Sequence, residues 1–175
     1  MKKAIALLLA LVMVFALCAC GGGGDSAGGD KVVKIGVFEP ASGDSGAGGK
    51  KEMLGMQYAN QETPTVEIGG ETYKVELVYS DNGSDSAKAV SAASKLVNEK
   101  VSIVLGSYGS GVSIAASDTF KQAGIPAVGV TCTNPNVTAG NSHYFRICFL
   151  DPFQGTVLAN YASSELKAKK AYCLG

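Results

Sequence analysis

The chain has 175 residues, and its 15 lysines and arginines balance 15 aspartates and glutamates, so the formal net charge is zero. Apolar residues make up 46% of the sequence, which is enough for a core and excludes a fully disordered chain. The zero net charge and the lack of a basic block argue against a protein that binds nucleic acid through its phosphates. The length fits about one domain.

The first twenty residues have the pattern of an export signal. Lys2 and Lys3 precede an apolar run from Ala4 to Ala19, which is shorter than the ~20 residues of a membrane-spanning helix and typical of a secretory signal. Cys20 ends a Leu-Cys-Ala-Cys segment and is followed by glycines. This segment resembles the bacterial lipobox, which implies that residues 1–19 are a lipoprotein signal peptide and that Cys20 is lipidated. The alternative is an ordinary secretory signal that is cleaved elsewhere.

Residues 20–31 are rich in glycine and are predicted to form a flexible tether that holds a domain away from a membrane. Three cysteines follow, at positions whose spacing fits no zinc motif. They are Cys132, Cys148 and Cys173. We expect small buried hydrophobic residues, with a Cys132–Cys148 disulfide as the alternative in an exported protein.

Strand and helix patterns alternate from Val32 onward. The predicted strands are 32–38, 66–68, 73–79, 101–105, 125–130, 144–149 and 171–174. The predicted helices are 50–60, a segment from Ser84 or Asp85 to about 99, 112–123 and 151 to about 167. Short apolar strands that alternate with helices predict an α/β fold with a parallel sheet flanked by helices on both faces. We interpret residues 32–150 as a ligand-binding lobe and residues 151–175 as the beginning of a second, truncated lobe.

In such sheets ligands bind at the carboxyl ends of the strands. The loop Gly106–Gly111 lies at such an end and precedes a predicted helix, where backbone N–H groups and the Ser110 hydroxyl favour a carboxylate or a phosphate. The alternative is a plain turn in which Ser110 only caps its helix. Residues Thr131, Cys132 and Thr133 follow the next strand and are predicted to lie beside that helix start.

Other chemistries lack their motifs. The glycine-rich segment 43–48 departs from the G-x-G-x-x-G fingerprint, and no Gly-Lys-Ser/Thr phosphate loop occurs. The only histidine is His143, and Ser110 lacks the G-x-S-x-G setting of a hydrolase nucleophile, so a Ser110–His143 catalytic pair is a poor candidate. We expect His143 at a strand edge and Arg146 in an ion pair between elements. The sequence predicts no enzyme activity, cofactor or metal site.

A series of segments in register resembles the type I substrate-binding proteins of ABC transporters, in particular the branched-chain amino acid (Leu/Ile/Val) group. The segments are Ile35-Gly36-Val37 with Ala41-Ser42-Gly43, Val78 to Asn82, Lys95-Leu96-Val97, Val104 to Gly111, Thr133 to Thr138, and Phe145-Arg146 with Asp151 and Gln154-Gly155. The resemblance covers residues 32 to 175.

The resemblance implies lobe 1 of a two-lobed clamp that closes on an amino acid and delivers it to permease subunits in the membrane. It implies that Gly109, Ser110 and Thr133 bind the ligand carboxylate and that Thr131 or Cys132 contributes backbone contacts. A lipid on Cys20 would hold the protein at the outer face of the bacterial cytoplasmic membrane, in the periplasm or at the cell surface.

Many members of the family carry an aromatic residue near position 48, which covers the ligand side chain. This sequence has Gly48 there, which leaves room for a larger or different ligand. Tyr108 is then the candidate for apolar cover of the ligand side chain. The same fold also serves amide and urea binders. Two alternatives stay open, namely a ligand-sensing lobe of a signalling receptor and a secreted lipoprotein hydrolase.

Overall fold

The computed structural model describes residues 31–172, and the predicted signal segment, Cys20, residues 21–30 and Cys173 lie outside these residues. From Val32 onward the chain forms one unit. Its elements are β1 (Val32–Glu39), α2 (Gly46–Glu62), β2 (Thr65–Ile68), β3 (Glu71–Asp81), α3 (Ser86–Asn98), β4 (Ile103–Leu105), α4 (Ser110–Gln122), β5 (Ala127–Gly129), η1 (Pro135–Val137), β6 (Tyr144–Arg146) and α5 (Asp151–Ser164).

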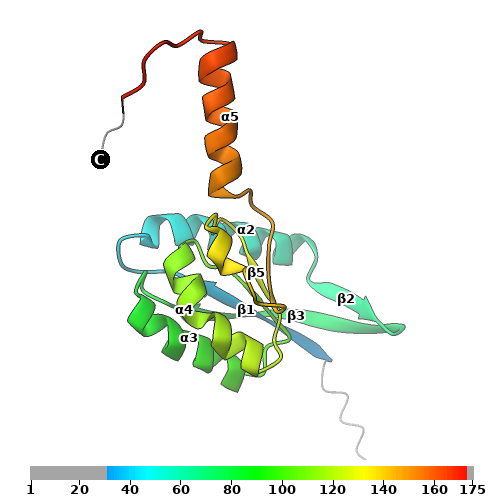
Figure 1. The fold of residues 1–175 in the computed structure, drawn as a ribbon. Coiled ribbons are helices and arrows are strands. Elements are labelled where there is room, and N and C mark those ends of the chain that lie inside the picture. The colour runs from blue at the N-terminus through cyan, green and yellow to red at the C-terminus, as the bar shows by residue number, and fades with distance from the viewer. Residues whose placement is uncertain (1–30, 173–175) are drawn as a thin grey trace, which may run out of the picture. The chain divides into compact units, whose positions relative to one another are not determined.

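The strands form one sheet in the order β2-β3-β1-β4-β5-β6 (Figure 1). Every neighbouring pair is parallel except β2 and β3, which form an antiparallel hairpin. Gly69 and Gly70 make its turn with φ of 62° and 81°, values that other residues rarely adopt. The predicted parallel sheet is therefore confirmed, with one antiparallel strand added at its edge.

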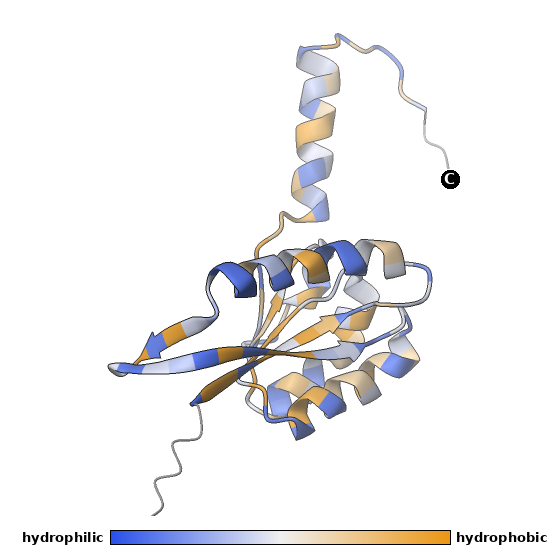
Figure 2. Cartoon of the chain, turned by 180° about the vertical axis from the view of Figure 1, so that it is seen from behind, coloured by the Kyte–Doolittle hydropathy of each residue, from blue (hydrophilic) through white to orange (hydrophobic). Residues whose placement is uncertain are grey.

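The core lies between the sheet and helices α3 and α4, which cover the same face (Figure 1). Phe38 of β1 and Phe120 of α4 meet edge to face, with ring centroids 5.5 Å apart. Helix α3 buries Ala89, Ala92, Ala93 and Leu96 at helical spacing. Figure 2 shows the central strands as mostly hydrophobic, whereas the helices mix hydrophobic and hydrophilic residues.

Helix α2, on the other face of the sheet, begins earlier than the sequence predicts. The segment up to Gly49 was expected to be a loop, but the helix starts at Gly46. Glycine has a low helix propensity, which hides this start in the sequence. The reason for the glycines is close packing, because a Cβ at Gly49 would lie 2.3 Å from the carbonyl oxygen of Pro40.

The end of the described chain also differs from expectation. Helix α5 ends at Ser164 and carries no buried residue. Ala171 and Tyr172 form no strand, because no strand among the described residues pairs with them, and the rest of the predicted strand 171–174 lies outside these residues. Strand β6 ends at Arg146 rather than at Phe149.

Candidate functional site

The strand order reverses direction at β1, whose neighbours are β3 on one side and β4 on the other. The loops that follow β1 and β4 therefore leave the sheet in different directions, and open α/β sheets bind ligands in the crevice at this switch point. The loop after β5 lies next along the same edge, because β4 and β5 are parallel neighbours. These three loops contain every predicted ligand residue.

Helix α4 begins at the carboxyl end of β4 with an uncapped terminus. Gly109 is the N-cap residue, no side chain caps the helix, and its first turn holds no acidic residue. The first intrahelical bond runs from the N–H of Ser113 to the carbonyl of Gly109, at 3.2 Å, so the N–H groups of Ser110, Gly111 and Val112 have no intrahelical acceptor. With the positive end of the helix dipole, these donors suit an anion.

The loop after β5 lies beside this helix start, as the sequence predicted. The N–H of Asn134 donates to Oγ of Ser110 at 3.3 Å, which leaves the Ser110 hydroxyl proton able to donate elsewhere. The Thr131 hydroxyl lies within 3.3 Å of the carbonyl oxygen of Tyr108. Thr133 is half-buried, and its carbonyl accepts the N–H of Asp151 at 3.1 Å, where α5 begins.

Cys132 is fully buried, and burial raises the pKa of its thiol to about 11. Cys132 and Cys148 are free thiols. Cys132 is thus the small buried hydrophobic residue that the sequence predicted. The backbone carbonyl of Cys132 helps to fix the loop after β5, because it accepts a hydrogen bond from Arg146 at 2.9 Å.

Within the part of the chain that the structure describes, Arg146 does not form the predicted ion pair. Its guanidinium donates to the carbonyls of Cys132 at 2.9 Å, Asn134 at 2.9 Å and Pro135 at 3.1 Å, and to Oγ1 of Thr138 at 2.8 Å. The planar fork of donors suits four acceptors that curve around it. Arg146 therefore holds the loop after β5 in shape. The sequence gives no signal for this role, because three of the acceptors are backbone carbonyls.

Tyr108 lies beside Gly48 of α2. Its side chain is 42% exposed. A Cβ at Gly48 would lie 2.5 Å from two carbons of the Tyr108 ring, so the glycine makes room for the ring. The ring of Tyr108 thus takes the place beside α2 that a side chain at position 48 would need.

Two glutamates behind this loop were missed by the sequence analysis. Glu39 ends β1 and is only 1% exposed; its Oε2 accepts the N–H of Tyr108 at 2.8 Å. The pKa of Glu39 is raised to about 9, mainly by burial and then by the carboxyl of Glu52. The hydrogen bond from the N–H of Tyr108 opposes this shift. Glu52 of α2 also accepts a hydrogen bond from the Thr131 hydroxyl. A signal was present in the sequence, since Glu39 interrupts the apolar row of its strand.

Buried polar groups fix the turns on either side of the switch point. Nδ2 of Asn82 donates to Oγ of Ser107 at 3.0 Å and approaches the carbonyl of Phe38 at 3.4 Å, and all three residues are buried. The Tyr144 hydroxyl donates to the carbonyl of Gly106 at 2.9 Å, and burial raises the pKa of Tyr144. The loop after β4 is therefore held from β1, β3 and β6.

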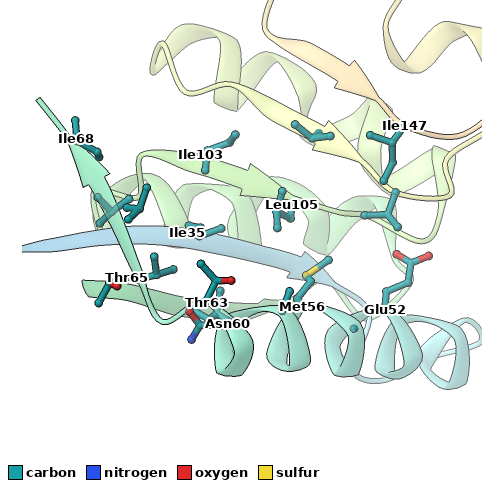
Figure 3. A pocket seen from close by; sticks show the side chains of 18 residues that line it. Ile35, Glu52, Met56, Asn60, Thr63, Thr65, Ile68, Ile103, Leu105 and Ile147 are labelled. Carbon is teal, nitrogen blue, oxygen red and sulfur yellow. The ribbon is translucent and has the colours of Figure 1, made fainter. Parts of the chain in front are cut away.

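A cavity of about 730 Å³ lies elsewhere, on the sheet face beside α2 (Figure 3). Ile35, Leu105 and Ile147 line it from the strand side, and Met56 and Glu52 line it from α2. None of the predicted ligand residues lines it. Helices were expected over both faces, but on this face α2 leaves apolar side chains of the sheet uncovered.

His143 does not approach Ser110 as a catalytic partner must. It precedes β6, at the amino edge of the parallel strands, whereas Ser110 follows β4 at their carboxyl edge. Its ring meets the hydroxyl of the adjacent Ser142 at 3.1 Å. Within residues 31–172 no cluster of three or more potential metal ligands occurs, and none of the helices described there is long and apolar enough to cross a membrane.

The described residues form an α/β unit with a mostly parallel sheet and free backbone donors at the carboxyl edge of that sheet. Residues 32–175 match the family model described as periplasmic binding protein. The chain belongs to this family, whose name places its members outside the cytoplasm.

Relatives with known names are binding proteins. The chain is 37% identical over 141 residues to an amino acid binding protein of Pseudomonas aeruginosa, a match that covers 79% of this chain and 37% of the relative. It is 33% identical over 172 residues to Leu/Ile/Val-binding protein homolog 1 of Brucella abortus, covering 97% of this chain and 44% of the relative. The chain thus spans less than half the length of these curated relatives.

Solved structures agree in fold. The leucine binding protein LivK of Thermotoga maritima matches with a TM-score of 0.72 and 39% identity, covering 79% of this chain and 39% of that one. The branched-chain amino acid binding protein LivJ of Streptococcus pneumoniae, solved with isoleucine, matches with a TM-score of 0.71 and 35% identity, covering 79% of this chain and 40% of that one. Both confirm the periplasmic-binding-protein fold.

Proposed function

We propose that this chain is the first lobe of an exported substrate-binding lipoprotein of an ABC transporter, which captures a branched-chain or other aliphatic amino acid and delivers it to the permease. The observation that carries the proposal is the uncapped start of α4 beside the loop after β5. The relatives named for leucine, isoleucine and valine support the ligand class.

The chemistry of the loops suits an amino acid. The free N–H groups at the start of α4, with the hydroxyls of Ser110 and Thr133, bind the carboxylate. The backbone of Thr131 and Cys132 offers acceptors to the ammonium group. Tyr108 covers the aliphatic side chain. These are fixed donors and acceptors, which bind a ligand rather than transform it.

The proposal includes a second lobe, which closes with the first around the ligand. Residues 32–150 form the first lobe and residues 151–175 begin the second. Helix α5 supports this boundary, since its large apolar side chains are exposed rather than packed on the described lobe: Phe153 at 63%, Leu158 at 60% and Tyr161 at 54%. The lengths of the relatives leave room for a second lobe.

The proposed anchor is a lipid on Cys20, after removal of residues 1–19, with residues 20–31 as the tether. A lipid would keep the protein near its permease and raise its local concentration there. Cys20→Ala should release the protein from the membrane fraction or stall its processing. Cys148→Ala, which leaves the signal untouched, is the control. An unchanged membrane fraction for Cys20→Ala would rule out the lipid anchor.

The test of the function is ligand-dependent thermal stabilisation of the full-length protein across a panel of amino acids and their amides. A ligand that binds only the folded state raises the unfolding temperature, and at a concentration of 100 times Kd the gain is about 2.7 kcal/mol. Leucine, isoleucine or valine should give the largest shift. A panel in which no amino acid shifts the transition contradicts the proposal.

A further inference from the structure

Glu39 occupies a position where the strand calls for an apolar side chain. Side chains alternate along β1, so Glu39 continues the row of Val33, Ile35 and Val37 on the α2 face. It is 1% exposed. An ionised carboxylate buried in this way is costly unless a cation faces it. Among the described residues no lysine, arginine or histidine pairs with Glu39.

The two oxygens of Glu39 have different surroundings. Oε2 accepts the N–H of Tyr108 at 2.8 Å. Oε1 is buried and has no hydrogen-bond donor in the ionised state. It is packed tightly, because a Cβ at Gly106 would lie 2.6 Å from it. A carboxylate in this place leaves one acceptor unsatisfied, a cost that a bound proton removes.

Glu52 has the same arrangement as Glu39, with one oxygen hydrogen-bonded and the other buried without a donor. One of its oxygens accepts the Thr131 hydroxyl, while the other, Oε2, is buried without a donor. The two carboxyl groups meet at the same loops, because the Thr131 hydroxyl that contacts Glu52 also contacts the carbonyl of Tyr108, whose N–H donates to Glu39. Glu52 is also one of the groups that raise the pKa of Glu39. Two facing carboxyl groups, each with an unsatisfied oxygen, are both satisfied when one proton lies between them.

We propose that Glu39 and Glu52 share one proton at neutral pH and that the protonated pair is a positioning element for the ligand-binding loops. Glu39 holds the backbone of Tyr108, and Glu52 holds the hydroxyl of Thr131. The pair therefore joins β1 and α2 to the loops after β4 and β5, across the switch point of the sheet. Its link to ligand binding rests on the proposed function, whereas the shared proton does not.

Among residues 31–172 no cationic side chain forms an ion pair with Glu39 or Glu52. From α2 the facing group is Glu52, and from β6 it is the phenol of Tyr144, which stays neutral because burial raises its pKa. From β3 the register neighbour is Asp81, whose Oδ1 accepts the N–H groups of Ala41 and Gly83 at 2.8 Å each. Loss of the proton places two negative charges face to face, and the loop that carries Tyr108 should loosen.

The direct test is a titration of the carboxyl groups by carbon NMR in the full-length protein without ligand. One glutamate carboxyl should titrate near pH 9, far above the 4.5 of an ordinary glutamate, and Glu39→Gln should abolish that transition. Glu62 is exposed at the end of α2, the helix that carries Glu52, so Glu62→Gln should leave the transition near pH 9 in place. If every carboxyl of the parent titrates in the usual range, the shared proton is ruled out.

A stability profile gives a second readout. The native pKa lies above the unfolded one, so the contribution of the pair is complete below pH 4.5 and is lost as pH rises towards about 9. The unfolding temperature of the parent should fall across this window. Glu39→Gln keeps an acceptor for Tyr108 and gives Glu52 an N–H donor, so its profile should be flatter, as should that of Glu52→Gln. Parent-like slopes in both variants overturn the proposal.

Two further experiments distinguish a shared proton from a bound cation, and an effect on ligand binding from an effect on stability alone. A divalent cation between two carboxylates would make the profile respond to a chelator, and such a response would overturn the shared proton. Leucine affinity should fall more steeply with rising pH in the parent than in Glu39→Gln, where only the loss of the ligand's own ammonium charge lowers it; an equal fall in both removes the link to ligand binding. If no amino acid binds at any pH, the proposed function fails, while the NMR titration still decides the pair.

Discussion

The ring of Tyr108 fills the space beside α2 that a side chain at position 48 would occupy. A Cβ at Gly48 would come within 2.5 Å of two ring carbons, closer than side chains pack. The Tyr108 ring, from the loop after β4, can therefore occupy this space only because residue 48 of α2 has no side chain. We therefore expect Tyr108, from a different element, to supply the apolar cover that relatives are expected to take from an aromatic residue near position 48.

This relationship predicts the effect of changing either residue. Tyr108→Ala should weaken leucine binding about tenfold, since losing the ring exposes apolar area worth roughly 1.4 kcal/mol. Gly48→Ala should displace the ring and weaken binding in the same direction. Gly55→Ala is the matched control on α2, because its Cβ meets nothing within 4 Å. Calorimetry on the full-length proteins measures all three, and Tyr108→Ala with parent affinity would show that the ring does not cover the ligand.

A second prediction concerns the carboxylate. The Ser110 hydroxyl should add a hydrogen bond to a charged acceptor, worth about 1.5–3 kcal/mol. Ser110→Ala should therefore weaken leucine binding about tenfold or more, and Thr133→Ala should act in the same direction. Leucinamide, which lacks a free carboxylate, should be insensitive to both changes. Parallel calorimetric titrations with leucine and its amide measure the difference.

The control for these variants has to avoid the buried network. Ser107 lies in the same loop, but it is buried and accepts the amide of Asn82 at 3.0 Å, so Ser107→Ala would disturb the fold. Ser91 is exposed on α3, with its hydroxyl bonded to the carbonyl of Lys88. Ser91→Ala should leave leucine affinity unchanged. Full affinity for every ligand in Ser110→Ala and Thr133→Ala would place the carboxylate elsewhere.

The strands and the loops at their ends could be predicted from the sequence because their signals are local. The apolar run that begins at Val32, the Asp85 cap and the hairpin glycines each specify their own element. The start of α2 could not be predicted in this way. Its glycines are selected by close contacts with Pro40 and Tyr108, which belong to other elements.

The candidate site shows the same division. Ser110 and the residues Thr131–Thr133 stand out as candidates in the sequence because they lie in loops rich in glycine, serine or threonine that directly follow apolar strands. The roles of Glu39 and Arg146 were not, since their partners are distant in sequence and include backbone atoms, which leave no mark on composition. A polar residue that interrupts an apolar row, as Glu39 does, is the signal worth examining in related sequences.

Asp81 gives a prediction with the opposite pH dependence from that of Glu39. Burial works against its charge, but hydrogen bonds from the Ser42 hydroxyl and from the N–H groups of Gly83, Ala41 and Ser42 lower its pKa below 3.8. Its contribution to stability is present above pH 3.8 and is lost as pH falls through the lowered pKa. Asp81→Asn should cost about 1 kcal/mol at pH 7, since Asp81 is exposed, and nothing at pH 2.

Urea unfolding of the full-length protein at several pH values measures this difference. Asp85→Asn is the comparison, because Asp85 caps α3 through the N–H of Ala87 at 2.7 Å and asparagine caps equally well. Asp85→Asn should therefore stay near the parent at neutral pH. A loss for Asp81→Asn that is as large at pH 2 as at pH 7 would mean that the charge of Asp81 is not involved.

The last prediction concerns Arg146 and the loop it holds. Arg146→Ala removes donors to three carbonyls and to the Thr138 hydroxyl, and each hydrogen bond to a charged group contributes about 1.5–3 kcal/mol. These contributions do not add, because the four bonds share one guanidinium, so the free energy of unfolding should fall by about 3 kcal/mol. Arg146→Lys keeps the charge but not the planar fork, so it should restore only part of the loss.

The loop that Arg146 holds also carries Thr131 and Thr133, so ligand affinity should fall together with stability. Arg146→Ala should weaken leucine binding more than Arg146→Lys, in the same order as their losses in urea unfolding. Lys121→Ala is the control, because the Lys121 ammonium donates to the Gly140 carbonyl at 3.3 Å on an exposed turn, away from the loop after β5. If Arg146→Ala unfolds at a lower urea concentration but binds leucine as tightly as the parent, the loop after β5 stabilises the lobe without shaping the ligand site.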